Sequence, residues 1–240
     1  WIEDLTMVEV RDYIKEGKTN ALILTGGIEE NGPYLVTGKH NYVLRVMGES
    51  IARNMGNTLI VPIMTLEPGN PEGGNISPGT VYLSPETYRA ALRDIANSLK
   101  SQGFTNIFLM GDSGGNQTPM REVVEELTAK WSNSPVQTHF IGEYYQNRIM
   151  RTFIQEELGV EEVPEGLHDE YFIAATMMAA DLNSVRTDQR IRSGKFSING
   201  VSLLPIEKTL MNARKIIDYR TELTVIAMRK AMGAGASNQH

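Results

Sequence analysis

The sequence contains no cysteine. This absence excludes disulfide bonds, a thiol nucleophile and a zinc site built on cysteine. It leaves the compartment open, because a cysteine-free protein is stable in either redox environment. The chain begins at Trp1 instead of methionine, as a trimmed chain or one with a removed signal peptide would. We therefore expect a protein that is either cytoplasmic or exported.

Long apolar runs and an excess of positive charge are also missing. No stretch approaches the ~18 consecutive apolar residues of a membrane span, so we expect a soluble protein without a membrane partner. The net charge of −6 gives no reason to expect nucleic acid as a partner. A hydrophobic content of 41% is ordinary for a globular chain. A small molecule is the partner that we expect.

Short apolar runs alternate with amphipathic helical patterns along the whole chain. The runs predict strands at residues 21–25, 59–64, 106–110 and 136–141. The patterns predict helices at residues 4–16, 41–55, 84–102, 118–131, 147–158, 169–180 and 207–232, with a hairpin around Asn199-Gly200 and a frayed tail from residue 233. This order predicts one α/β domain over residues 1–240, a three-layer αβα sandwich on a mostly parallel sheet.

Polar residues follow the first predicted strand, where residues 22–40 read LILTGGIEENGPYLVTGKH. In open α/β sheets, ligands bind where the chain leaves the carboxyl ends of the strands. Glu29, Asn31 and His40 therefore lie in the expected place for a site, and Asp112 and Ser113 follow the third strand. A Gly- and Pro-rich loop at residues 67–80 has the length of a functional loop.

Carboxylates and imidazoles are ligands for zinc, manganese or iron, and a bound divalent ion makes water a nucleophile near neutral pH. We predict one such ion on Glu29, His40 and Asp112. His168, at the start of a predicted helix, is the candidate acid/base, with Glu170 beside it. The alternative for all these residues is that they are solvated loop side chains and helix caps. His139, inside a strand, and His240, in the tail, are not candidates.

Four motifs resemble the creatininase (creatinine amidohydrolase) family along nearly the whole chain. They are GGIEENGPYLVTGKH at residues 26–40, PGTVYL at 78–83, GDSGGN at 111–116 and HDEYFIAA at 168–175. The resemblance implies a creatininase-like fold, a hydrolase of C–N bonds in small polar molecules, and a homo-oligomer, commonly a hexamer. In the family, two divalent metals are bound by Glu, His and Asp of the first motif and His of the third.

Several of these ligand positions are substituted here. Asn31 stands where the first motif has His, His40 where it has Asp, and Ser113 where the third motif has His. Glu29 and His168 are kept. A dinuclear site is therefore not expected.

Three functions remain open. The first is an amide, cyclic-amide or formamide hydrolase with one metal, in which Asn31 or Asn116 hydrogen-bonds the oxyanion. The second is a metal-free hydrolase that uses Ser113 and His168. The third is a small-molecule-binding or regulatory protein without turnover.

Overall fold

The computed structural model describes residues 1–73 and 76–236. Part of the predicted 67–80 loop and the last four residues of the predicted tail, which include His240, lie outside the described residues. The remaining predicted elements can all be compared with the structure.

A parallel sheet of four strands forms the centre of the fold. Its order is β2 (Thr58–Ile60), β1 (Asn20–Thr25), β5 (Asn106–Gly111) and β6 (Gln137–Phe140). Every neighbouring pair is parallel. All six residues of β1 are buried, as the uninterrupted apolar run predicts for a strand covered on both faces. The predicted mostly parallel α/β sheet is confirmed.

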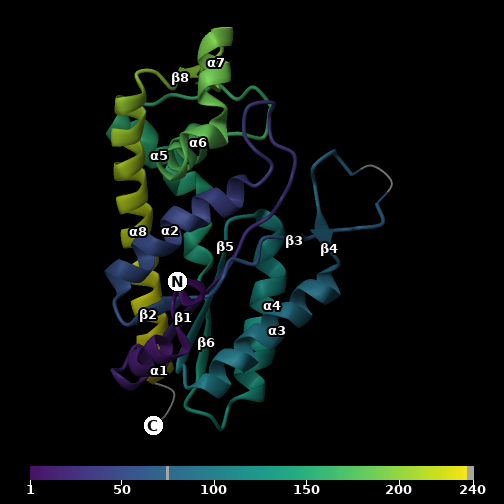
Figure 1. Ribbon diagram of the computed structural model, residues 1–240, viewed down its shortest axis with the longest axis vertical. Helices are drawn as coiled ribbons and strands as arrows, with labels where there is room; N and C mark the ends of the chain where they lie inside the picture. Colours follow the sequence, from purple (N-terminus) through teal and green to yellow (C-terminus); the bar gives the residue numbers. More distant parts are fainter. Residues whose placement is uncertain (74–75, 237–240) are drawn as a thin grey trace.

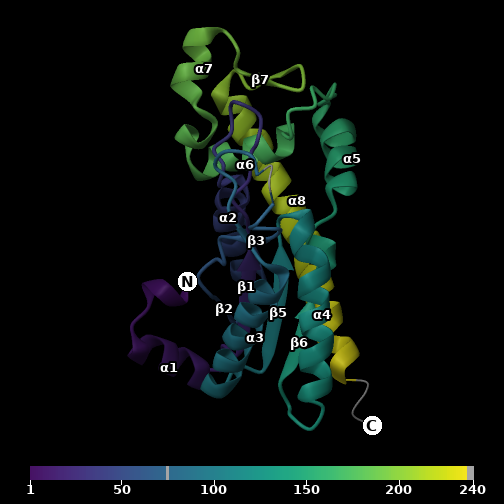
Figure 2. The same cartoon turned by 90° about the vertical axis from the view of Figure 1, so that its right-hand side faces the viewer.

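Helices cover both faces of this sheet (Figures 1 and 2). On one face lie α3 (Pro85–Gln102) and α4 (Gly114–Lys130), and on the other α2 (Lys39–Met55) and α8 (Ile206–Ala236). Side chains of a strand alternate between faces. Accordingly, Ala21 and Ile23 join one hydrophobic cluster, whereas Leu22 and Leu24 join the other. The αβα sandwich follows from this alternation, and its extent as one domain over residues 1–240 stays a prediction.

Local signals explain most helix boundaries. Thr6 and Glu9 form a capping box at the start of α1 (Met7–Lys15), which follows a short 3-10 helix, η1 (Ile2–Asp4). Ser84 caps α3, and the left-handed Gly103 ends it. The predicted start of the next helix, at residue 118, was wrong. Ser113 accepts a hydrogen bond from the Gly115 amide and caps α4. The helix therefore begins at Gly114, four residues before the predicted start.

Smaller elements lie beyond the carboxyl edge of the sheet. They are β3 (Glu67–Pro68), β4 (Tyr82–Leu83), η2 (Gly142–Tyr144), α5 (Asn147–Leu158), α6 (Tyr171–Ala180), η3 (Leu182–Val185), α7 (Thr187–Ser193), β7 (Ser197–Ile198) and β8 (Val201–Ser202). The hairpin predicted around Asn199-Gly200 is confirmed by the antiparallel pair of β7 and β8. Helix α7 was not predicted, and α8 continues into the tail that we predicted to be frayed.

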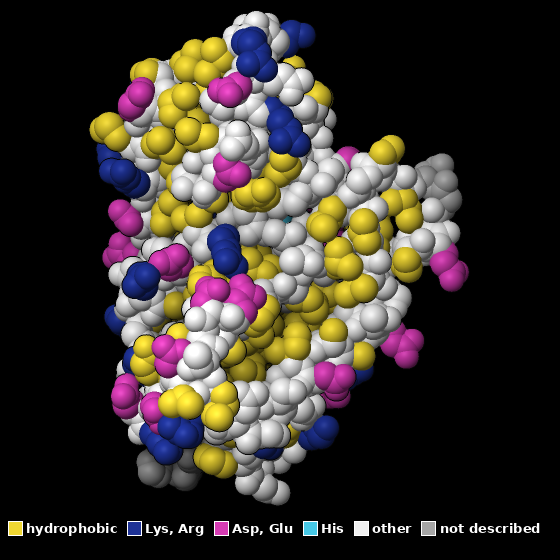
Figure 3. Space-filling view, in the orientation of Figure 1, with side chains coloured by type: hydrophobic (Ala, Val, Ile, Leu, Met, Phe, Trp, Pro, Cys, Tyr) yellow, Lys and Arg dark blue, Asp and Glu magenta, His cyan; other side chains and the backbone are white. Residues whose placement is uncertain are grey.

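The face drawn in Figure 3 carries many hydrophobic side chains between α1 and α3. A groove of about 560 Å³ lies there, lined mainly by Ile2, Leu5, Met7, Val10 and Ile14. None of the helices in the described ranges, 1–73 and 76–236, has the length and apolar character that a membrane span requires.

Candidate active site

A pocket of about 440 Å³ lies at the carboxyl edge of the sheet. The loop after β1 and the end of β5 reach it, together with the long loop before β4 and the turn before α6. Its lining side chains include Glu29, His40, Glu67, Tyr82, Ser113, Tyr145 and His168. The structure therefore brings together residues that are far apart in the chain, at the position expected for a ligand in an open α/β sheet.

His40 lies between two carboxylates on the floor of this pocket. Its Nδ1 is 2.8 Å from Oδ2 of Asp112, and its Nε2 is 2.6 Å from Oε1 of Glu29. Burial disfavours the charged imidazolium, but the hydrogen bonds to the two carboxylates outweigh it and raise the pKa of His40 to about 9. At neutral pH His40 is therefore a cation with both ring nitrogens protonated.

Asp112 is buried beneath His40 and accepts three hydrogen bonds. Besides His40, the Tyr144 hydroxyl donates to its Oδ1 at 2.9 Å and the Arg220 guanidinium at 3.0 Å. Burial alone would raise the pKa of Asp112. The charge of Arg220 and the hydrogen bond from His40 lower it by more, so the pKa of Asp112 lies below its usual value. Asp112 is thus an ionised carboxylate with both oxygens engaged.

Glu29 contacts three side-chain nitrogens through one oxygen. Its Oε1 is 2.6 Å from Nε2 of His40, 3.3 Å from Nζ of Lys39 and 3.6 Å from Nε2 of His168. Burial opposes ionisation, but the hydrogen bond and charge of His40, with the charge of Lys39, lower the pKa of Glu29 to about 2. This carboxylate stays charged throughout the physiological range.

Ser113 and Glu67 form a second pair on the wall of the pocket. The Ser113 hydroxyl donates a short hydrogen bond to Oε2 of Glu67, while the buried Oε1 of Glu67 has no hydrogen-bond partner among the described residues. Burial raises the pKa of Glu67, and the bond from Ser113 lowers it only in part. Glu67 is therefore the carboxyl group of this pocket that most readily holds a proton.

His168 reaches the same pocket from a left-handed turn with φ of 55°. Its Nδ1 lies 3.1 Å from the carbonyl oxygen of Glu30. Because a carbonyl only accepts, Nδ1 carries the proton and Nε2 faces Glu29. The side chain is 58% exposed, so a ligand in the pocket can reach it.

Asn31 and Asn116, the predicted oxyanion donors, hydrogen-bond to backbone carbonyls and do not line this pocket. The Asn31 amide donates to the carbonyls of Glu29 and Val36, which closes the loop that carries Glu29. The Asn116 amide donates to the carbonyls of Thr25 and Gly26. Neither is among the residues that line the pocket.

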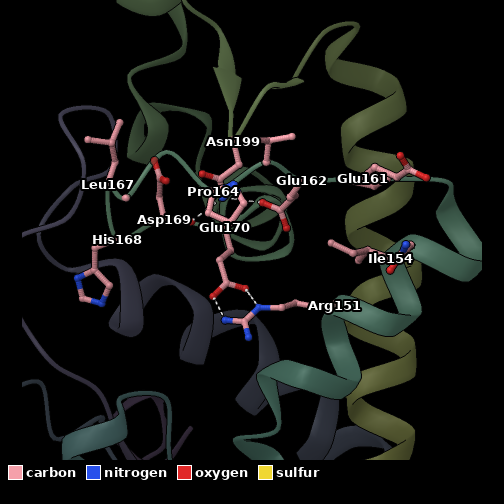
Figure 4. Close-up of a pocket in the computed structure, with 14 residues that line it drawn as sticks. Arg151, Ile154, Glu161, Glu162, Pro164, Leu167, His168, Asp169, Glu170 and Asn199 are labelled. Atoms are coloured by element: carbon pink, nitrogen blue, oxygen red, sulfur yellow. Dashed lines mark hydrogen bonds and ion pairs between the residues drawn. The ribbon is translucent and has the colours of Figure 1, made fainter.

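Glu170 belongs to a neighbouring pocket of about 570 Å³, which Figure 4 shows. It forms an ion pair with Arg151, whose Nε lies 3.0 Å from its Oε2. In Figure 4 the side chain of Asp169 points away from those of His168 and Glu170, and Glu170 reaches toward Arg151. Asp169 is buried, and within the part of the chain that the structure describes neither of its carboxylate oxygens has a hydrogen-bond partner. Glu170 is therefore separate from the pocket that contains Ser113.

Sequence reasoning missed three residues of this network: Lys39, Glu67 and Arg220. Two of them had a weak signal, since Lys39 precedes His40 and Glu67 opens the long glycine-rich loop. Arg220 had none, because it is one of many charged residues in a long helix. The predicted residues Glu29, His40, Asp112 and His168 do form one contiguous set.

Comparison with known proteins gives a consistent result for sequence and structure. The family model described as "Creatininase: Creatinine amidohydrolase" matches residues 3–216. A crystal structure of creatinine amidohydrolase (creatininase) is similar with a TM-score of 0.67 and 16% identity, over 98% of this chain and 96% of that one. No curated protein matches the chain.

Two similar solved structures carry metals in their descriptions. One is "Creatininase Mn", with a TM-score of 0.67 and 16% identity over 96% of each chain. The other is a mutant creatininase of "Zn-Zn type", with a TM-score of 0.65 and 15% identity over 96% of each chain. At these identities the likeness establishes the fold.

The side chains of this pocket do not fit a divalent metal of that kind. His40 has no free lone pair, and both oxygens of Asp112 are engaged. The ammonium of Lys39 contacts Glu29. Within residues 1–73 and 76–236, no group of three or more His, Cys, Asp or Glu residues is arranged to hold a metal ion. The predicted ligands Glu29, His40 and Asp112 thus lie together as an ion-paired network.

Proposed function

Because the chain belongs to the creatininase family, we propose that it hydrolyses a C–N bond of a small polar molecule: an amide, a cyclic amide or a formamide. One observation carries the proposal. The pairs Glu29–His168 and Glu67–Ser113 face the same 440 Å³ pocket. A base and a proton donor on one cavity are what amide hydrolysis requires. No metal is part of the proposal, since the donor groups do not fit one.

His168 is the base in this mechanism. With its proton held at Nδ1 by the Glu30 carbonyl, Nε2 presents a lone pair toward Glu29. A water bound there, oriented by Glu29, loses a proton to Nε2 as its oxygen attacks the carbonyl carbon. A new C–O bond forms, and the carbonyl oxygen becomes an oxyanion at the amino-terminal end of α4, where the helix dipole favours negative charge.

Glu67 is the proton donor. Its raised pKa favours the protonated form, and it delivers that proton to the leaving nitrogen as the C–N bond breaks. Ser113 holds Glu67 in place. Transfer of the proton from His168 to Glu67 after product release restores both groups, so protons balance over the cycle.

The test is an assay for released amine or ammonia with a panel of small amides, cyclic amides and formamides. We expect turnover of at least one class, and His168→Gln reduces kcat by about 10²-fold or more. The matched control is His139→Gln, since His139 is buried in β6 and hydrogen-bonds Asn106 away from the pocket. Equal loss in both variants contradicts the assignment of His168.

A second function, binding without turnover, is favoured by the ion pairs that already engage Glu29, His40 and Asp112. The Ser113–His168 nucleophile pair of a serine-type hydrolase is not formed, because Ser113 donates to Glu67 and not to His168. A wild-type protein that binds members of the panel by calorimetry but releases no product supports this second function and overturns the first. Unchanged kcat in Ser113→Ala rules out Ser113 as the nucleophile.

We also infer that the protein is a homo-oligomer, by analogy with the hexamers of the family. The apolar groove along α1 supports this inference, because exposed apolar patches commonly mark interfaces.

A further inference from the structure

Lys39 is a buried cation at the edge of the pocket. Its side chain is only 2% exposed, although a lysine ammonium is almost never fully buried unless it is paired. Two partners account for its position. Nζ lies 3.3 Å from Oε1 of Glu29 and 3.2 Å from the carbonyl oxygen of His168.

Lys39 completes a row of alternating charges under the pocket. The order along the contacts is Arg220, Asp112, His40, Glu29 and Lys39. Each carboxylate of the row lies between two nitrogen cations. Both carboxylates of the row are thus already paired with nitrogen groups, and Glu67 lies outside the row.

A divalent ion on Glu29 would lie close to the ammonium of Lys39, whose Nζ is 3.3 Å from Oε1 of Glu29. Like charges at that distance repel strongly where solvent is excluded. Neither Lys39 nor Arg220 can become a ligand while charged, because ammonium and guanidinium groups have no acceptor. Removal of the Lys39 cation therefore lowers the electrostatic barrier to a divalent ion at Glu29.

We propose that the ammonium of Lys39 is the resident cation of this site. It occupies the carboxylate that a divalent metal would need, and it ties Glu29 to the turn that presents His168. The positive charge of the pocket is thus supplied by side chains. The inference is independent of the proposed hydrolysis, since it concerns which cation Glu29 binds.

The experiment measures metal binding by the full chain. Protein purified without chelator is analysed for metal content, then titrated with MnCl₂ and with ZnCl₂ by calorimetry and by thermal unfolding. We expect far less than one ion per chain and no rise in Tm, because a ligand raises Tm only if it binds the folded state. One tightly bound manganese or zinc ion per wild-type chain overturns the proposal.

Variants of Lys39 test the cause. Lys39→Gln removes the charge, and we expect its affinity for Mn²⁺ or Zn²⁺ to rise at least about tenfold over wild type, whereas Lys39→Arg stays as weak as wild type. The control is Lys18→Gln, whose lysine makes surface contacts with Glu16 at 3.9 Å and with the Tyr13 ring at 3.5 Å from its centroid. No gain in folded Lys39→Gln overturns the proposal. If that variant does not fold, the wild-type titration still decides the outcome.

Discussion

Arg220 on α8 donates to Asp112 at the end of β5 at 3.0 Å, although 108 residues separate them in the chain. Both side chains are almost fully buried, with exposed fractions of 5% and 3%. The contact attaches the C-terminal helix to the floor of the pocket. The position of His40 depends on it, because Asp112 is the carboxylate that binds Nδ1 of His40.

Replacement of Arg220 is expected to destabilise the fold strongly. Arg220→Met leaves Asp112 as a buried charge without its guanidinium, which typically costs about 3–5 kcal/mol. Urea denaturation measures the loss. The double variant with Asp112→Asn is expected to recover part of it, since the uncompensated charge is gone.

The control for this variant is Arg93→Met. Arg93 pairs with Glu126 at 3.0 Å on the surface, and such pairs contribute about 0–1 kcal/mol. If Arg220→Met loses no more free energy of unfolding than Arg93→Met, the buried pair stabilises the fold no more than a surface pair does.

Stability is expected to fall as the solution becomes alkaline. The pKa of His40 is raised from 6.5 to about 9, so between these values the folded state binds more protons than the unfolded state. The stabilisation is therefore complete below about pH 6.5 and lost as pH rises through about 9, by about 3 kcal/mol. Urea denaturation from pH 6 to pH 10 checks this. His40→Gln should flatten the curve, and an unchanged slope would refute the assignment.

Gly32→Ala is expected to displace the turn that carries His168. A Cβ at this position would lie 2.7 Å from the backbone oxygen of Leu167 and 3.1 Å from Oδ2 of Asp169. A backbone clash cannot be relieved by a change of rotamer. We expect lower kcat with the thermal unfolding transition still present. The matched control in the same loop is Gly38→Ala, whose Cβ would meet only ordinary contacts at 3.9 Å, and activity equal in the two variants would contradict the prediction.

The assembly state can be tested through the groove along α1. Met7 is 74% exposed and lines that groove. If the inferred homo-oligomer covers it, Met7→Asp weakens association, and light scattering shows a smaller mass than for wild type. Ser132→Asp, at an exposed position just after α4 that does not line the groove, is the control. A wild-type monomer at micromolar concentration rejects the oligomer.

The sequence alone was enough for the layers of the fold. Residues 21–24 are uniformly apolar, which predicts a strand covered on both faces, and Ser84-Pro85 predicts the start of α3. These patterns depend only on residues that are close together in the sequence, so they can be recognised without knowledge of the tertiary structure. Where a local signal was ambiguous, as for Ser113-Gly114-Gly115, the boundary was misplaced because a cap and a loop look alike in sequence.

Tertiary structure alone decided what the site contains. The sequence placed Glu29, His40 and Asp112 at the edge of the sheet and so suggested metal ligands, but it could not show that Lys39 and Arg220 would reach two of these side chains. Charge pairing depends on distance in space, and those distances are set by how α2 and α8 pack on the sheet. The sequence does not distinguish a carboxylate that binds a metal from one that pairs with an ammonium group.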